Sequence, residues 1–170
     1  MKPLIYALHV CLLFILGCGY GFEGKVSGLP DDIRSLYVSY AENSSNIMQL
    51  GGLVTDEVRR QFTTSKFLKL VDNDKADAVL SLNIRSVRVT GATLTNISRT
   101  SSRQITITLD SFLKRKESGA LIWQGVGIVC DETYVVESDQ VVTELNEDLA
   151  LKNIARELAE KIHNFMFLGF

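Results

Sequence analysis

The sequence predicts an α+β fold, a two-layer sandwich in which two helices pack on one face of a mostly antiparallel four-stranded sheet. Two segments, residues 47–64 and about 138–165, repeat apolar side chains at helical spacing. Three others alternate apolar and polar side chains as strands do: 78–89, 104–113 and 120–133. The composition is 46% apolar and 22% charged with two prolines, which suits a packed core and excludes disordered and collagen-like chains.

The first strand and the first helix come early. Residues 35–40 are rich in β-branched and aromatic side chains, which favours a strand. One apolar helix face follows, with Ser44 and Ser45 as candidate N-caps; its members are Ile47, Leu50, Val54, Val58 and Phe62. Residues 67–71 indicate a short extra strand or an extended link, and a charged turn follows at 72–77.

The middle of the chain predicts a strand, a long hairpin connection and two further strands. The alternation of residues 78–89 changes phase at Ser86, which indicates a β-bulge. Residues 90–102 are rich in Thr, Ser, Gly and Asn, as hairpin connections are. In residues 120–133 we expect Ile122, Val126, Ile128 and Cys130 on one face of the strand. The element order is therefore β-α-β-β-β-α.

The closing helix has an apolar arc about 80° wide at 100° per residue. Its members are Leu151, Ile154, Leu158, Ile162 and Phe165. Ala155 and Ala159 flank this arc and permit close approach to a sheet. Ser138 or Asp139 could cap the helix start, because short oxygen-bearing side chains accept hydrogen bonds from free helical N–H groups.

The N-terminus has the pattern of a secretory signal. Lys2 is the only charged residue among the first 22, and an apolar run of thirteen residues follows from Leu4 to Leu16. That run is shorter than the roughly 20 residues that a membrane span needs, but it suits the apolar core of a signal peptide. Residues 1–17 are therefore expected to be a lipoprotein signal peptide.

The apolar run ends at Gly17 and Cys18, as in a bacterial lipobox. We expect Cys18 to carry acyl chains, which anchor a protein to a bilayer. Gly19 stands where an Asp would retain a lipoprotein in the inner membrane, so we expect an outer-membrane anchor with the protein on the periplasmic face. Residues 18–30 would be a glycine-rich tether and residues 31–170 a single α+β domain. An ordinary signal peptide with an incidental cysteine and an uncleaved helix remain alternatives.

The sequence offers no pattern of catalytic or metal-binding residues. His163 is expected on the helix surface, and Cys130 lies in an apolar alternation where a small core side chain would fit. Acidic pairs such as Asp131-Glu132 are expected in solvated turns. There is no P-loop, G-x-S-x-G or G-x-G-x-x-G motif, so the sequence predicts neither an enzyme nor a cofactor. A Cys130–His163 nucleophile pair remains an alternative, and the net charge of −2 argues against nucleic acid.

Basic side chains gather at the predicted hairpins. Arg and Lys pair well with phosphate, so a phosphorylated anionic glycolipid would suit them. The alternative is that they are solvating charges at the ends of the sheet. The candidates for binding are Arg88, Arg99, Arg103, Lys114, Arg115 and Lys116.

Several segments together resemble the LptE-type lipopolysaccharide-assembly lipoproteins. The chain has Cys18-Gly19-Tyr20-Gly21-Phe22, then Leu29-Pro30 and the strand Leu36-Tyr37-Val38. Ala76-Asp77-Ala78-Val79-Leu80 leads a later strand, another strand ends at Tyr134, and the last helix contains Ile154-Ala155 and Leu158-Ala159. The resemblance extends over nearly the whole chain after residue 17.

This resemblance implies an outer-membrane lipoprotein without enzymatic activity. Its partner would be the β-barrel translocon LptD, which it would plug and help to assemble, and it would assist delivery of lipopolysaccharide to the outer leaflet. The resemblance also implies that lipopolysaccharide contacts the middle hairpin, where Arg99 and Arg103 lie. A second basic position expected ahead of the last helix is absent, because residues 141–144 are Val-Val-Thr-Glu.

Two other functions stay open at this stage. The first is another periplasm-facing lipoprotein that serves as an accessory subunit of an envelope or transport complex. The second is a lipoprotein hydrolase that uses Cys130. Co-purification of a large barrel would separate the first from the LptD hypothesis, and retained function after Cys130→Ala would remove the second.

Overall fold

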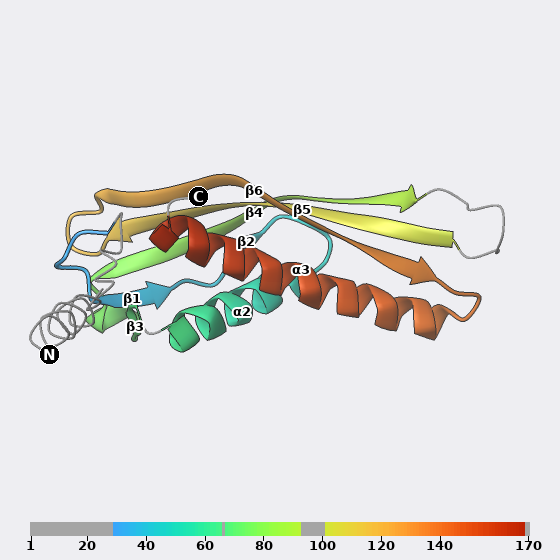
Figure 1. Cartoon of the computed structure of the whole chain (residues 1–170), viewed down its shortest axis with the longest axis horizontal. Coiled ribbons are helices and arrows are strands. Elements are labelled where there is room, and N and C mark those ends of the chain that lie inside the picture. The colour runs from blue at the N-terminus through green and yellow to red at the C-terminus, as the bar shows by residue number, and fades with distance from the viewer. Residues whose placement is uncertain (1–28, 66, 93–100, 169–170) are drawn as a thin grey trace, which may run out of the picture.

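The computed structural model describes residues 29–65, 67–92 and 101–168, which form two helices and a mixed six-stranded sheet (Figure 1). In chain order the elements are β1 (Ser35–Val38), β2 (Glu42–Asn43), α2 (Leu50–Ser65), β3 (Lys69–Leu70), the 3-10 turn η1 (Asn73–Lys75), β4 (Ala78–Ala92), β5 (Ser101–Arg115), β6 (Leu121–Val136) and α3 (Gln140–Leu168). The strands lie in the order β3-β1-β4-β5-β6, and β2 pairs with β4. The predicted α+β sandwich is confirmed.

The sheet has more strands than the predicted four and is mixed rather than mostly antiparallel. β4, β5 and β6 form an antiparallel meander, whereas β1 is parallel to both β3 and β4, and β2 is parallel to β4. The parallel pairs arise because α2 carries the chain back before the next strand begins. β3 lies within residues 67–71, where the sequence predicts a short extra strand or an extended link. β2 has two residues, too few for an alternating pattern to predict.

β-bulges decide which side chains of the long strands face the helices. The register of β4 and β5 shifts between Ile84 and Ser86, as predicted. A second shift in the β5–β6 pairing accompanies Gly127, whose φ is 70°. The extra residue turns Val126 away from the core, while Ile128 and Cys130 stay buried, so the predicted shared face for Val126 was wrong.

The core lies between the sheet and the two helices. α2 buries Val54, Val58 and Phe62, and α3 buries the predicted apolar arc, with Phe165 only partly buried. Each fully buried aliphatic or aromatic side chain contributes about 1.5–3 kcal/mol relative to an exposed one. Neither of the two described helices lies on the opposite face of the β4–β5–β6 meander, which we call the open sheet face (Figure 1).

The helix starts differ in their caps. α2 begins at Leu50, after a turn closed by a hydrogen bond from the Leu50 N–H to the Ile47 carbonyl (3.1 Å). The predicted cap Ser45 instead accepts a bond from the Ile47 N–H (3.2 Å). The predicted cap Asp139 is confirmed, because its Oδ1 accepts a bond from the Val141 N–H (2.9 Å).

Figure 1 shows an elongated molecule whose meander extends past α2 at one end. We call this the distal end; it contains Ala92, Ser101, Val136 and the start of α3. The proximal end contains the start of β1, Arg115 and the turn before β6. The fifteen residues of β5 separate the two ends by about 50 Å, at about 3.4 Å per residue.

Candidate functional site

The structure does not bring the predicted basic residues together. Arg88 is exposed and pairs with Thr106 on the open sheet face, which neither described helix covers. Arg103 is also exposed, but it lies two residues before the buried Ile105 in the same strand. The two side chains therefore share one face, and Arg103 points to the helix side of the sheet. Arg99 lies outside the described residues. So do Cys18, the predicted signal peptide and most of the predicted tether.

Arg103 lines an open pocket of about 390 Å³ at the distal end. Three carboxylates from the end of β6 and the start of α3 share this pocket: Glu137, Glu144 and Glu147. Glu147 Oε2 accepts a hydrogen bond from the Tyr134 hydroxyl (3.2 Å). The surrounding negative charge offsets the charge of Arg103, which reduces its attraction for phosphate.

The other predicted cations lie at the proximal end and have local structural partners. Arg115 forms an ion pair with Asp32, which lowers the pKa of that carboxyl group. The Lys116 ammonium donates a hydrogen bond to Asn73 Oδ1 (2.5 Å). Lys114 is exposed on the open sheet face and pairs with Val79. About 37 Å of β5 separates Lys114 from Arg103, at about 3.4 Å per residue.

One carboxylate fastens the proximal turn to the first strand. Asp77 Oδ2 accepts bonds from the Ser35 hydroxyl (2.7 Å), the Ser35 N–H (2.8 Å) and the Arg34 N–H (3.0 Å). These three donors stabilise the charged form, so the pKa of Asp77 is lowered, with the Ser35 hydroxyl the largest cause. Asp77, Arg115 and Lys116 therefore stabilise the proximal end of the fold.

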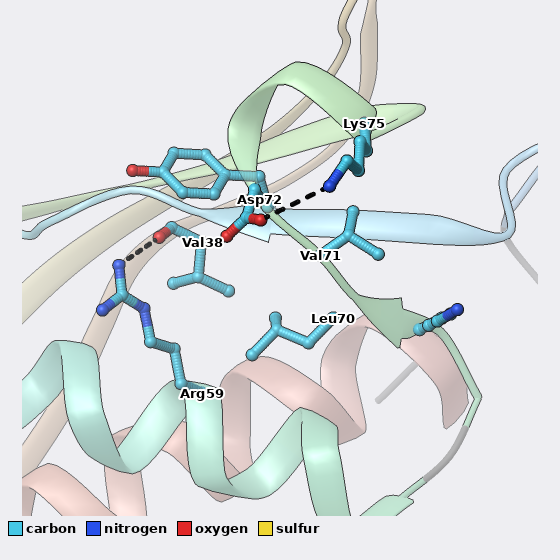
Figure 2. A pocket seen from close by; sticks show the side chains of 8 residues that line it. Val38, Arg59, Leu70, Val71, Asp72 and Lys75 are labelled. Carbon is cyan, nitrogen blue, oxygen red and sulfur yellow. Dashed lines mark hydrogen bonds and ion pairs between the residues drawn. The ribbon is translucent and has the colours of Figure 1, made fainter.

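Figure 2 shows a basic pocket of about 570 Å³ that the sequence analysis did not predict. Arg59 of α2 reaches the end of β1, where its guanidinium donates to the Val38 carbonyl (2.8 Å). Lys69 and Lys75 also line the pocket, and Lys75 pairs with Asp72 at 3.8 Å. These residues come from β1, α2, β3 and η1, so no local sequence pattern could have joined them.

The open sheet face contains a charged pair at its centre. Asp110 of β5 is buried; its Oδ2 accepts from Arg85 (2.5 Å) and its Oδ1 from the Gly127 N–H (2.7 Å). The carboxylate thus joins the two bulges on either side of it. The same sheet face mixes partly or fully exposed polar side chains with exposed valines. The polar residues are Ser81, Asn83, Ser86, Thr106, Thr108, Gln124 and Thr133, and the valines are Val126, Val129 and Val135.

Cys130 and His163 lie in separate environments. Cys130 is buried as predicted, and burial raises the pKa of its thiol to about 11, so the thiol is neutral at pH 7. His163 is buried, not on the helix surface as expected, and packs against Phe62, Phe67 and Phe167. Within the described residues, no group of His, Cys, Asp and Glu could hold a metal ion.

Comparison with solved structures supports the fold. A minor lipoprotein from Acinetobacter baumannii matches with a TM-score of 0.55 and 12% identity, over 82% of this chain and 95% of that one. Lipoprotein B from Nitrosomonas europaea matches with a TM-score of 0.54 and 14% identity, over 89% and 92%. Rare lipoprotein B from Shewanella oneidensis matches with a TM-score of 0.50 and 17% identity, over 76% and 92%.

These likenesses define a class of small α+β folds, and the sequence defines the family. The family model for lipopolysaccharide assembly, LptE, matches residues 33–166, and the chain belongs to this family. No curated protein matches the sequence. None of the described helices is long and apolar enough to cross a bilayer.

Proposed function

We propose that this protein is an outer-membrane lipoprotein that plugs the LptD β-barrel, supports the assembly of that barrel and assists lipopolysaccharide delivery to the outer leaflet. The observation that supports this proposal most is the face of the β4–β5–β6 meander that no described helix covers, in a member of a lipopolysaccharide-assembly family. Hydroxyl and amide side chains lie on this face beside three exposed valines. In the proposed pathway, residues 1–17 are removed and Cys18 carries the lipid that holds the domain on the periplasmic face.

The open sheet face suits the lumen of a barrel. Large membrane barrels have polar, hydrated interiors, so a surface rich in hydroxyl and amide groups can contact them without burying unpaired charges. The buried Asp110 joins both neighbouring strands, which keeps this surface in one shape. The lipid anchor would keep domain and barrel close and so raise their effective concentration.

Co-purification with the barrel tests this docking face. The variant Thr106→Lys with Thr133→Lys adds two charges to the open face, which a close lumen contact would not tolerate. We expect less barrel to co-purify from solubilised outer membranes, by about tenfold or more. The control Thr63→Lys with Thr64→Lys makes the same chemical change at exposed positions of α2.

Three results would contradict the proposal. These are the absence of a barrel in the wild-type preparation, equal loss with the α2 control, and full recovery with the sheet-face variant. A different envelope complex recovered in place of the barrel would instead support an accessory-subunit function. Circular dichroism of each purified variant checks that the fold is retained.

We further propose that lipopolysaccharide contacts the distal hairpin mainly through Arg99, rather than through the proximal cations. Arg103 would contribute less, because three carboxylates share its pocket, and Arg88 would contribute only from the opposite sheet face. The proximal cations are less suited to bind phosphate, because Arg115 pairs with Asp32 and Lys116 donates a hydrogen bond to Asn73. Arg99→Asp with Arg103→Asp should weaken binding of lipopolysaccharide by about tenfold or more. The control Lys114→Asp with Lys152→Asp changes the net charge equally; equal weakening by both variants would remove this site assignment.

A further inference from the structure

We propose that the distal half of the β6–α3 unit docks onto a partner protein that presents an apolar patch surrounded by Lys and Arg. We call this surface, residues 131–149, the acidic arm. The proposal does not depend on the barrel, because it follows from the charge, exposure and rigidity of the arm itself.

The acidic arm holds an unusual share of the protein's negative charge. Within residues 131–149 the sequence has seven acidic residues and no Lys or Arg, although the whole chain has a net charge of only −2. The rest of the chain therefore has a net charge of +5. The acidic residues are Asp131, Glu132, Glu137, Asp139, Glu144, Glu147 and Asp148. Arg103 of β5 offsets one of these charges in the pocket that it shares with three of the carboxylates. The remaining excess of negative charge attracts basic partners and speeds their association.

An exposed apolar stripe runs along the helical part of the arm. The exposed fractions are 63% for Val141, 40% for Val142, 58% for Leu145 and 59% for Leu149. Val141, Leu145 and Leu149 follow each other at four-residue steps and therefore share one side of α3. Burial in the core begins only with Ala150. Clustered exposed aliphatic side chains with a charged rim are typical of protein interaction sites.

Hydrogen bonds of residues outside the apolar stripe hold the acidic arm in position. The Asn146 amide donates to the Val135 carbonyl of β6 (3.0 Å), and the amide of Gln49, just before α2, donates to Asp148 (2.9 Å). These bonds fix the opposite flanks of the helix, so the stripe remains directed outward. A surface fixed before binding loses little conformational freedom when a partner docks.

The charge of the arm decides between possible occupants. A second copy of the chain would place two acidic rims against each other, and like charges across an interface oppose binding. The carboxylates on the helical part of the arm repel lipid phosphates for the same reason, whereas the lipopolysaccharide contact proposed above depends on the cations of the hairpin. A basic rim with an apolar centre satisfies both features of the arm, so we assign the partner this chemistry.

Site-specific photocrosslinking from Val141 tests the assignment in cells that naturally make the protein. A benzophenone amino acid at this position should form an adduct with a protein, and mass spectrometry should map it to a segment with net positive charge. Leu145→Ser with Leu149→Ser should lower the adduct yield about tenfold or more, because the stripe supplies the contact centre. Glu137→Lys with Glu144→Lys should lower it similarly.

A matched control uses leucines exposed outside the acidic arm. Leu121 of β6 and Leu168 at the end of α3 are 51% and 53% exposed, so Leu121→Ser with Leu168→Ser removes similar apolar surface and should leave the adduct yield unchanged. No adduct, an adduct with lipid or with a second copy, or a crosslinked segment without net positive charge would overturn the proposal. Equal loss with the control pair would overturn it as well.

Discussion

His163 shows how packing can override the local sequence context of a single residue. It follows the apolar arc of α3 and was expected to face solvent, but Phe62 of α2 and Phe167 enclose it. Its Nε2 atom is buried and has no hydrogen-bond partner in the described part of the chain. The sequence could not predict this position, because Phe67, which also packs against it, follows α2 and lies far from it along the chain.

The burial of His163 makes stability depend on pH. Burial lowers the pKa of this imidazole below its usual 6.5, so the unfolded chain binds a proton that the native protein does not. The stability that the neutral, buried imidazole contributes is fully present above pH 6.5. It is lost as the pH falls from 6.5 towards the lowered pKa. The slope for one group is at most about 1.4 kcal/mol per pH unit.

Urea unfolding between pH 7.5 and 5.5 measures this dependence. The wild-type free energy of unfolding should fall with decreasing pH more steeply than that of His163→Phe, which keeps the aromatic packing and does not titrate. Identical slopes for the two proteins would show that His163 titrates alike in both states.

At the scale of the element, periodicity predicted both helices and the three long strands. The apolar face of α2 and the arc of α3 are buried as expected, and the bulge near Ser86 is present. The faces of β6 were predicted wrongly at Val126, because an inserted residue reverses the alternation. Gly125-Val126-Gly127 was the available sequence signal, since glycine often marks a bulge.

The positive φ of Gly127 predicts a specific sensitivity of this bulge. Gly127→Ala should lower the free energy of unfolding by about 1–2 kcal/mol, because L-residues are strained in the left-handed region. Gly91→Ala in β4 is the matched control, since a Cβ there would meet no atom within 4 Å. Equal stabilities of the two variants in urea unfolding would contradict the structural role of the bulge.

For the basic candidate residues, the sequence did not predict which side chains lie together in the folded protein. Arg88 and Arg103 are near each other along the hairpin, yet the alternation of their strands places them on opposite sheet faces. The basic pocket in Figure 2 needs β1, α2, β3 and η1 to meet, which no local pattern reveals. A site that depends on tertiary neighbours therefore appears only in the folded molecule.

At the scale of the whole molecule, the proposed functions are divided along the long axis. The proximal end joins the chain that follows the proposed anchor and is fastened by Asp77 and by the Arg115–Asp32 ion pair. The distal end holds the hairpin proposed for lipopolysaccharide and the acidic arm proposed for a protein partner. The open sheet face between them is available for the barrel. The family match over residues 33–166 covers both ends.

The proposed lipid anchor would place this whole arrangement at the outer membrane, so the mass of the protein recovered from that membrane is the most direct test. We predict a polypeptide that begins at Cys18 and is heavier than its residues by the mass of the attached acyl groups. Recovery of a chain that still contains residues 1–17, or of an unmodified Cys18, would contradict the account.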